Sequence, residues 1–269
     1  MARKKRQRTP VKAIRKQHAP AKDSLEIPAE GIRLNRYIAK AGVCARRKAD
    51  ELIAAGRVKV NDQVVTELGT RVMPGDRVKV DDRYIEPQAY TYILLNKPAD
   101  TITTLQDERG RRTVMDLIDD ESLKEAGLFP VGRLDRNTVG VLLLTNDGEL
   151  AHRLMHPRYH VEKLYHVRTE RPVKPHELEQ MRKGIPLEDG IARADDVMYL
   201  SEDHREIGIV LHEGRNRQIR RMLEALGHQV KHLERVNYAG LTTEGVRRGK
   251  WRRLYPHEIK RLKNRLKLR

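Results

Sequence analysis

The stretch that decides the fold runs from residue 132 to residue 148 and reads Gly132-Arg133-Leu134-Asp135-Arg136-Asn137-Thr138-Val139-Gly140-Val141-Leu142-Leu143-Leu144-Thr145-Asn146-Asp147-Gly148. Residues 139–144 are apolar at successive positions, which indicates an internal strand buried on both faces. Asp135 lies on a turn just ahead of this strand, between Arg133 and Arg136. The two arginines favour an ionised carboxylate, so Asp135 is a candidate nucleophile or base. The alternative is an aspartate that only caps the local backbone.

Composition points to a polyanionic partner. The 269 residues carry a formal net charge of +17, and the basic residues are clustered along the chain. Each Lys or Arg laid on a phosphate releases condensed counterions, so a cationic chain favours nucleic acid. Aromatic residues make up only 4% of the chain. Contacts to phosphates are therefore favoured over stacking of bases on aromatic side chains.

The chain offers no signal for export or for a membrane. A single cysteine, Cys44, allows no disulfide framework and suits a reducing compartment, so a cytoplasmic protein is expected. No apolar run approaches the length that spans a bilayer. The basic N-terminus is not followed by the apolar stretch of a secretory signal.

Four segments are expected along the chain. Residues 1–30 predict a disordered basic arm, which either holds RNA without specificity or only adds solubility. Residues 31–86 predict a compact unit of two short helices and a small sheet. Residues 91–255 predict a larger domain, joined to it by a short linker. Residues 256–269 predict a basic C-terminal helix or tail, with Ile259, Leu262 and Leu266 at helical spacing.

The larger domain has no regular alternation of strands and helices. Strands are expected at residues 92–96, 139–145, 161–169, 207–211 and 230–235. Helices are expected at residues 113–118, 149–155, 175–183 and 216–226. This order favours an α+β fold with a mixed, mostly antiparallel sheet.

Two further segments carry residues of chemical interest. In the strand after residue 160, Val161, Lys163, Tyr165 and Val167 share one face, so Tyr165 is either a half-buried core residue or the wall of a binding pocket. The segment from His212 to Met222 follows a strand and opens a helix. Its arginines lie on one face, which is either solvated or faces a ligand.

No metal or nucleotide cofactor is expected. His152, His156 and His160 have the spacing of metal ligands, but Pro157 interrupts a helix joining them and no fourth ligand is evident. The chain has neither a phosphate-cradling Gly-Lys-Ser/Thr loop nor a dinucleotide fingerprint.

Three motifs, in order, resemble those of the ribosomal RNA pseudouridine synthases, in the branch that acts on small-subunit or large-subunit RNA. They are the segment around Asp135, the segment Val161–Val167 and the segment His212–Met222. A fourth piece, Leu94–Pro98, is similar to the first motif of the family, although Ala99-Asp100 stands where a glycine usually follows. There Lys97 is expected to be structural or RNA-contacting, not catalytic.

Residues 31–86 resemble the S4 RNA-binding domain through Gly42–Ala49 and Gly56–Asp62. Ala45 stands where the family usually has a serine that caps the second helix, and the loss of such a cap costs on the order of 1 kcal/mol. A small helical linker with a solvated basic face is the alternative.

The resemblance implies specific roles. Asp135 would be the catalytic residue, Arg220 its partner, Tyr165 the packing surface for the base, and Ile219 a residue lining the pocket. Asp135 would attack the sugar or remove a proton from it, and the sequence leaves both open. RNA contacts are expected from ten basic residues: Arg33, Arg36, Arg46, Arg47, Lys48, Arg57, Arg133, Arg136, Arg215 and Arg217.

The expected activity is isomerisation of uridine to pseudouridine in ribosomal RNA, free or in an assembling subunit, by a monomer. The context around residues 150–157 and 213–221 favours the large-subunit (23S) members of the family. The alternative is a non-catalytic S4-domain factor for RNA binding or ribosome assembly. A metal-dependent nuclease would need clustered carboxylates, and none is evident.

Overall fold

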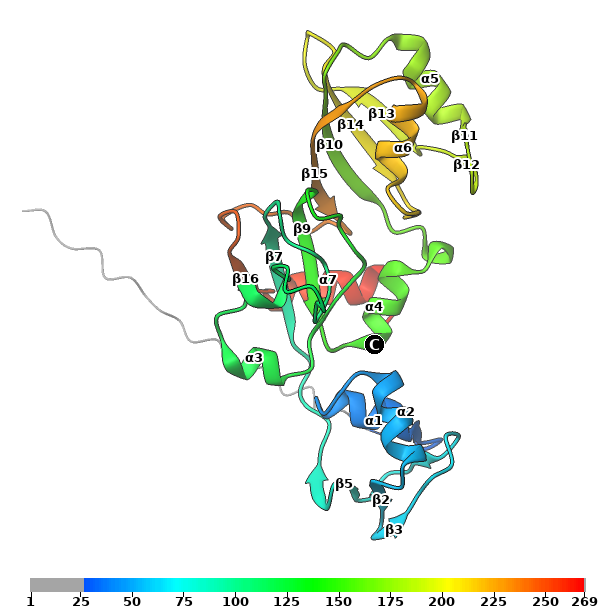
Figure 1. Ribbon diagram of the computed structural model, residues 1–269, viewed down its shortest axis with the longest axis vertical. Helices are drawn as coiled ribbons and strands as arrows, with labels where there is room; N and C mark the ends of the chain where they lie inside the picture. Colours follow the sequence, from blue (N-terminus) through cyan, green and yellow to red (C-terminus); the bar gives the residue numbers. More distant parts are fainter. Residues whose placement is uncertain (1–26, 269) are drawn as a thin grey trace, which may run out of the picture.

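The computed structural model describes residues 27–268, and Figure 1 shows a small N-terminal unit beside a longer body. Residues 1–26, which make up most of the basic arm predicted over residues 1–30, lie outside the described residues. No helix within residues 27–268 is long and apolar enough to cross a membrane.

The N-terminal unit packs two short helices on strands, as predicted. Helices α1 (Leu34–Lys40) and α2 (Arg46–Ala54) cover a sheet of order β3-β2-β5-β6, and a separate pair joins β1 to β4. The strands are β1 (Ile32–Arg33), β2 (Val58–Val60), β3 (Gln63–Val64), β4 (Arg71–Val72), β5 (Val78–Val80) and β6 (Arg83–Ile85). Asn61 and Asp62 both have positive φ, 50° and 66°, which closes the tight β2–β3 turn.

The body is built on one mixed sheet of order β13-β14-β10-β15-β9-β7-β16, with β8 paired to β9. Its strands are β7 (Tyr92–Lys97), β8 (Phe129–Pro130), β9 (Val139–Thr145), β10 (Lys163–Thr169), β13 (Asp196–Tyr199), β14 (Glu206–Leu211), β15 (Val230–Tyr238) and β16 (Trp251–Arg253). Every pairing is antiparallel except that of β15 with β9. The α+β fold with a mostly antiparallel sheet is confirmed.

The parallel β15–β9 pairing divides the sheet into two halves. It covers only two residue pairs, Glu234 with Val139 and Arg235 with Gly140. A Cβ on Gly140 would lie 2.2 Å from the carbonyl oxygen of Arg235, and Gly140 has φ +105°. Only glycine allows the two strands to approach this closely.

The half of the sheet with β10 and β14 has one apolar cluster, and the half with β7 and β9 has two. One core joins β10, β14 and β15 to α5 (Pro175–Lys183) and α6 (Gln218–Ala225). The other half packs around β7 and β9, with α4 (Gly148–Met155), α7 (Pro256–Arg265) and α3 (Glu121–Glu125). In Figure 1 the two halves lie one above the other. The C-terminal segment is a docked helix, because Leu262 and Leu266 are buried in the core.

The two domains meet at a junction that the sequence did not reveal. Lys40 is buried there, and its Nζ donates to the Tyr90 hydroxyl at 3.0 Å. Burial lowers the pKa of Lys40 to about 8. The Gln88 amide donates to the Glu125 carbonyl oxygen across the same junction at 3.4 Å.

Several predicted elements differ from the observed ones. The helix predicted over residues 113–118 is only a 3-10 turn, η1 (Met115–Leu117), because Thr113 bonds to the Asp116 carboxylate and Ile118 is already extended. The strand predicted from Val161 begins at Lys163. Strands β13 and β16 and the hairpin of β11 (Ile185–Leu187) and β12 (Gly190–Ala192) were not predicted.

Candidate active site

A buried lysine fixes the loop that carries Asp135. Lys97, at the end of β7, is fully buried, and its Nζ donates to the carbonyl oxygens of Asp135 at 3.0 Å, Arg136 at 3.1 Å and Thr138 at 2.8 Å. A fourth bond goes to the carbonyl oxygen of Pro98 at 3.1 Å. Burial lowers the pKa of Lys97 to about 8, while the Asp135 carboxylate raises it. Lys97 therefore holds the loop of Asp135 by its backbone.

The same loop is held from its other side by Thr103. The Thr103 hydroxyl donates to the Leu134 carbonyl oxygen at 2.7 Å and accepts from the Leu134 N–H at 3.2 Å. Asp135 is thus flanked by fixed backbone on both sides, while its side chain stays 35% exposed. Asp135 lies just ahead of the buried strand β9, as the sequence predicts.

Arg220 reaches Asp135 from the other half of the sheet. It lies in the first turn of α6, and its Nε is 3.9 Å from Oδ2 of Asp135, an ion-pair distance rather than a hydrogen bond. The Arg220 side chain is 14% exposed. Burial lowers its pKa, Arg217 lowers it further, and Asp135 raises it. The structure brings the two predicted partners together.

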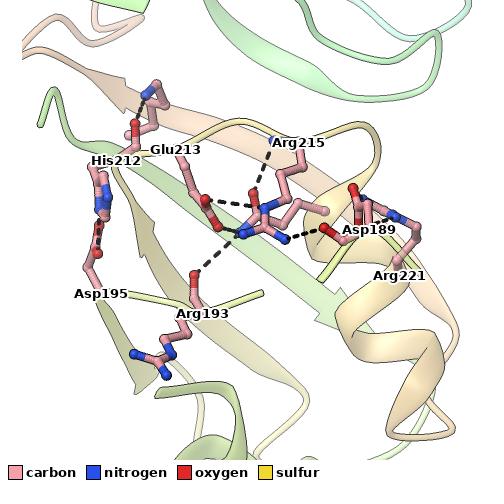
Figure 2. Close-up of polar contacts among 9 residues, drawn as sticks. Asp189, Arg193, Asp195, His212, Glu213, Arg215 and Arg221 are labelled. Carbon is pink, nitrogen blue, oxygen red and sulfur yellow. Dashed lines mark hydrogen bonds and ion pairs between the residues drawn. The ribbon is translucent and has the colours of Figure 1, made fainter. Parts of the chain in front are cut away.

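A polar network shapes the turn that leads into α6 (Figure 2). The Gln218 amide donates to Glu213 at 2.6 Å and accepts from the Arg215 N–H at 3.1 Å. Nε of Arg215 also donates to the Glu213 carboxylate at 3.3 Å. Arg217, the residue before α6, has φ 48° and a left-handed conformation. These contacts set the direction in which α6 begins.

The β11–β12 hairpin clamps the same helix (Figure 2). Both carboxylate oxygens of Asp189 accept from the Arg221 guanidinium at 2.9 Å, and the Asp189 carbonyl oxygen accepts from Arg215 at 3.3 Å. Arg221 follows Arg220 directly, so this bidentate contact also limits the rotation of α6 about its axis.

Lys163 joins the strand of Tyr165 to this turn. Its buried Nζ donates to the carbonyl oxygens of Val161 and His212. The His212 ring in turn contacts Asp195 at 2.6 Å. Burial lowers the pKa of Lys163 to about 8, and Arg235 lowers it further. The strand that carries Tyr165 and the turn that leads into α6 are therefore tied to each other.

Asp135, Tyr165, Ile219 and Arg220 line one cavity of about 1130 Å³. Tyr165 is half-buried on β10, and the pairing with β15 shifts register between Leu164 and Tyr165. Such a bulge re-aims the neighbouring side chain. The cavity is large enough for a nucleotide, because ligand sites commonly measure 300–1,000 Å³.

Four of the predicted RNA-contacting arginines, Arg133, Arg136, Arg215 and Arg217, also line this cavity. Arg136 is paired with Asp100 at 2.5 Å, and Arg217 lies 3.6 Å from Glu224. Arg133 is exposed. These guanidinium groups surround the cavity with positive charge.

The other predicted contacts, Arg33, Arg36, Arg46, Arg47, Lys48 and Arg57, lie on the N-terminal domain. Arg46 and Arg47 are exposed at the start of α2, where Ala45 provides no side-chain cap, so free amides face the same solvent. Arg57 is different, because it forms two hydrogen bonds with Asp81 that raise its pKa. Arg36 lies 3.9 Å from Glu149 of the larger domain.

The three histidines do not converge. The rings of His152 and His156 contact Tyr159, whereas His160 lies against His212, with ring centroids 4.8 Å apart. Within residues 27–268 no group of three metal-ligating side chains is placed to hold an ion.

Sequence reasoning missed two parts of the cavity. Arg235 is buried on β15 and donates from Nε to the Val141 carbonyl oxygen at 2.8 Å, and its guanidinium lies 4.5 Å from the centre of the Tyr238 ring. Residues 102–109 and Arg111 form another wall. The only sequence signal for Arg235 was an arginine on the inward face of a predicted strand. Residues 102–109 form a loop whose sequence has no periodicity, so no pattern indicated that it lines the cavity.

Comparison with known families defines the class. Residues 91–225 match the family described as RNA pseudouridylate synthase, and residues 32–78 match the S4 domain. The chain belongs to the RNA pseudouridylate synthase family and carries an N-terminal S4 domain.

Individual relatives are similar over nearly the whole chain. Ribosomal large subunit pseudouridine synthase B of Bacillus subtilis is 45% identical over 236 residues, which cover 86% of this chain and 95% of that protein. An uncharacterized RNA pseudouridine synthase of Aquifex aeolicus is 43% identical, with 86% and 93% covered. A crystal structure of a pseudouridylate synthase superposes with a TM-score of 0.62 at 29% identity, covering 86% of this chain and 99% of that one.

Proposed function

We propose that this protein isomerises a specific uridine of large-subunit (23S) ribosomal RNA to pseudouridine. The observation that carries the proposal is the ion pair of Asp135 and Arg220 in a cavity also lined by Tyr165 and Ile219. The relatives named as large-subunit pseudouridine synthases support the choice of RNA. A non-catalytic RNA-binding factor would need the basic surfaces but not this pair.

The reaction breaks the N1–C1′ bond of the uridine and forms a C5–C1′ bond. C5 loses a proton and N1 gains one, so the change is an isomerisation without oxidation or reduction. The uridine must first leave its stack, because a stacked and paired uracil cannot detach from the sugar and turn. Asp135 then acts on the sugar, as a nucleophile or as a base.

Each remaining residue has a positional task. Arg220 holds the carboxylate charged and oriented, and Tyr165 and Ile219 confine the uracil while it turns. Lys97 and Thr103 hold the Asp135 loop by its backbone. The S4 domain contributes affinity and register through phosphates, with Arg46 and Arg47 at the start of α2.

The site is complete within one chain, which supports a monomer. Chemistry of this kind needs no redox cofactor. We place the protein in the cytoplasm, where ribosomal RNA is assembled and a lone cysteine stays reduced.

The test is Asp135→Asn, which keeps the shape and removes the charge. This variant should bind large-subunit RNA like the wild type and form no pseudouridine. Asp203→Asn, at an exposed turn between β13 and β14, is the matched control and should stay fully active. Mapping pseudouridines in ribosomal RNA from cells that lack the protein identifies the target. Full turnover by Asp135→Asn would refute the assignment.

A further inference from the structure

Two apolar side chains that line the cavity are also exposed to solvent, next to several of its charged residues. Among the large hydrophobic residues that the described chain exposes, only Leu105 and Met155 line it. The sulfur of Met155 accepts the Gly132 N–H at 2.9 Å, which ties this side chain to the loop before Asp135. Leu105 is 41% exposed.

The loop that carries Leu105 is rigid although it lies on the surface. The Asp107 carboxylate, whose side chain is only 8% exposed, accepts the N–H groups of Arg109 at 3.2 Å and Arg111 at 2.8 Å. It also binds the Arg111 guanidinium at 2.6 and 3.1 Å. Four bonds to one carboxylate close the loop on itself.

The loop is also fixed relative to the catalytic carboxylate. Thr103 lies two residues before Leu105 and makes the reciprocal pair of bonds with Leu134, the neighbour of Asp135. The N–H of Thr101 donates to the Arg136 carbonyl oxygen at 3.3 Å. Leu105 is thus held at a set distance from the point where the sugar must sit.

The chemistry of this part of the cavity indicates the shape of the substrate. Arg109, Arg133 and Arg217 line the same cavity and suit phosphates, whereas an isobutyl group has no favourable contact with a phosphate. The apolar surfaces of RNA are the faces of its bases, and stacking covers them until a nucleotide is extruded. A stiff apolar side chain can then fill the vacated space.

Building on the proposed function, we infer that Leu105 is a wedge that enters the base stack as the target uridine leaves it, so the substrate is stacked, helical RNA rather than an unstructured strand. Leu105 determines which RNA structure is accepted. It takes no part in the bond changes at Asp135.

The first test uses a stem-loop RNA built around the uridine that loses its modification in cells without the protein. Leu105→Ala should lower the single-turnover rate about tenfold, a loss of the order measured when one stacking contact is removed. Leu105→Met, which keeps the apolar bulk, should restore most of the rate. Leu200→Ala removes another exposed leucine, which lies outside the cavity, and should leave the rate unchanged.

The same stem-loop with a mismatch beside the uridine has an already opened stack. In that RNA, Leu105→Ala should match the wild type. An equal loss in both RNAs, or no loss in either, would overturn the wedge.

A second measurement removes any dependence on turnover. In an Asp135→Asn background, 2-aminopurine placed next to the uridine should brighten on binding, because its neighbour leaves the stack. Adding Leu105→Ala should reduce the brightening, and adding Leu200→Ala should leave it unchanged. Brightening of wild-type size in the Leu105→Ala protein refutes the wedge. A wild-type protein that forms no pseudouridine in any RNA refutes the proposed function instead.

Discussion

Replacing Arg220 by methionine tests the central ion pair quantitatively. Two unit charges about 4 Å apart attract by about 4 kcal/mol at an effective dielectric constant near 20. The Asp135 side chain is 35% exposed, so solvent screening reduces this to about 2 kcal/mol in the free protein. Bound RNA excludes water from the site, so the attraction between Asp135 and Arg220 rises again toward about 4 kcal/mol. Since about 1.36 kcal/mol corresponds to a factor of ten in rate, Arg220→Met should lower kcat between about 30-fold and about 1000-fold.

The assay is release of tritium from C5-labelled uridine in large-subunit RNA at saturating protein. Arg220→Lys keeps the positive charge but lacks the planar pair of guanidinium donors. Its rate of tritium release should lie between those of the wild type and Arg220→Met. Arg217→Met is the matched control from the start of the same helix, with a side chain 47% exposed. It should lower the salt dependence of binding by about one phosphate contact and leave the rate at saturation unchanged. Wild-type turnover by Arg220→Met, together with a reduced salt slope, would show that Arg220 is a phosphate contact instead.

Three further outcomes follow from the fold. The pKa of Lys97 is lowered from 10.5 to about 8, so between these pH values the unfolded chain binds more protons than the folded one. The unfolding free energy of the wild type should therefore rise by about 3 kcal/mol from pH 8 to pH 10.5 relative to that of Lys97→Met, measured by urea melts at both pH values. An equal dependence of unfolding free energy on pH in the two proteins would contradict this. Gly140→Ala should cost roughly 3 kcal/mol or more, because the new Cβ meets the Arg235 carbonyl oxygen at 2.2 Å, whereas Gly69→Ala, in open surroundings, should melt like the wild type. Arg46→Ala with Arg47→Ala should flatten the slope of log affinity against log salt by up to about 1.8, and an unchanged slope would remove the S4 domain from RNA contact.

The long, strongly patterned elements of the fold were predictable. The apolar run Val139–Thr145 correctly predicted a buried central strand, β9. The apolar spacing of Ile219 and Leu223 agrees with the helix α6, which carries Arg220. Strands of three or four residues, such as β13 and β16, carry too few positions to establish a period. The helix predicted over residues 113–118 failed because side-chain bonds from Thr113 to Asp116 compete with helical hydrogen bonds.

The residue types of the site were predictable, and their backbone supports were not. The juxtaposition of Asp135 and Arg220 came from the family resemblance, and the structure reproduces it. Lys97 was expected to be structural or RNA-contacting, and its observed partners are carbonyl oxygens, which no side-chain pattern encodes. The burial of Lys40 at the junction of the two domains likewise has no counterpart in the sequence pattern.

The short parallel join beside Gly140 has a consequence for how activity is lost. Asp135 comes from the part of the sheet built on β7 and β9, whereas Tyr165 and Arg220 come from the part built on β10, β15 and α6. Neither fragment contains a complete set of reacting groups. Turnover therefore reports on the assembly of the whole protein, and a chain in which this join loosens becomes inactive well before it unfolds.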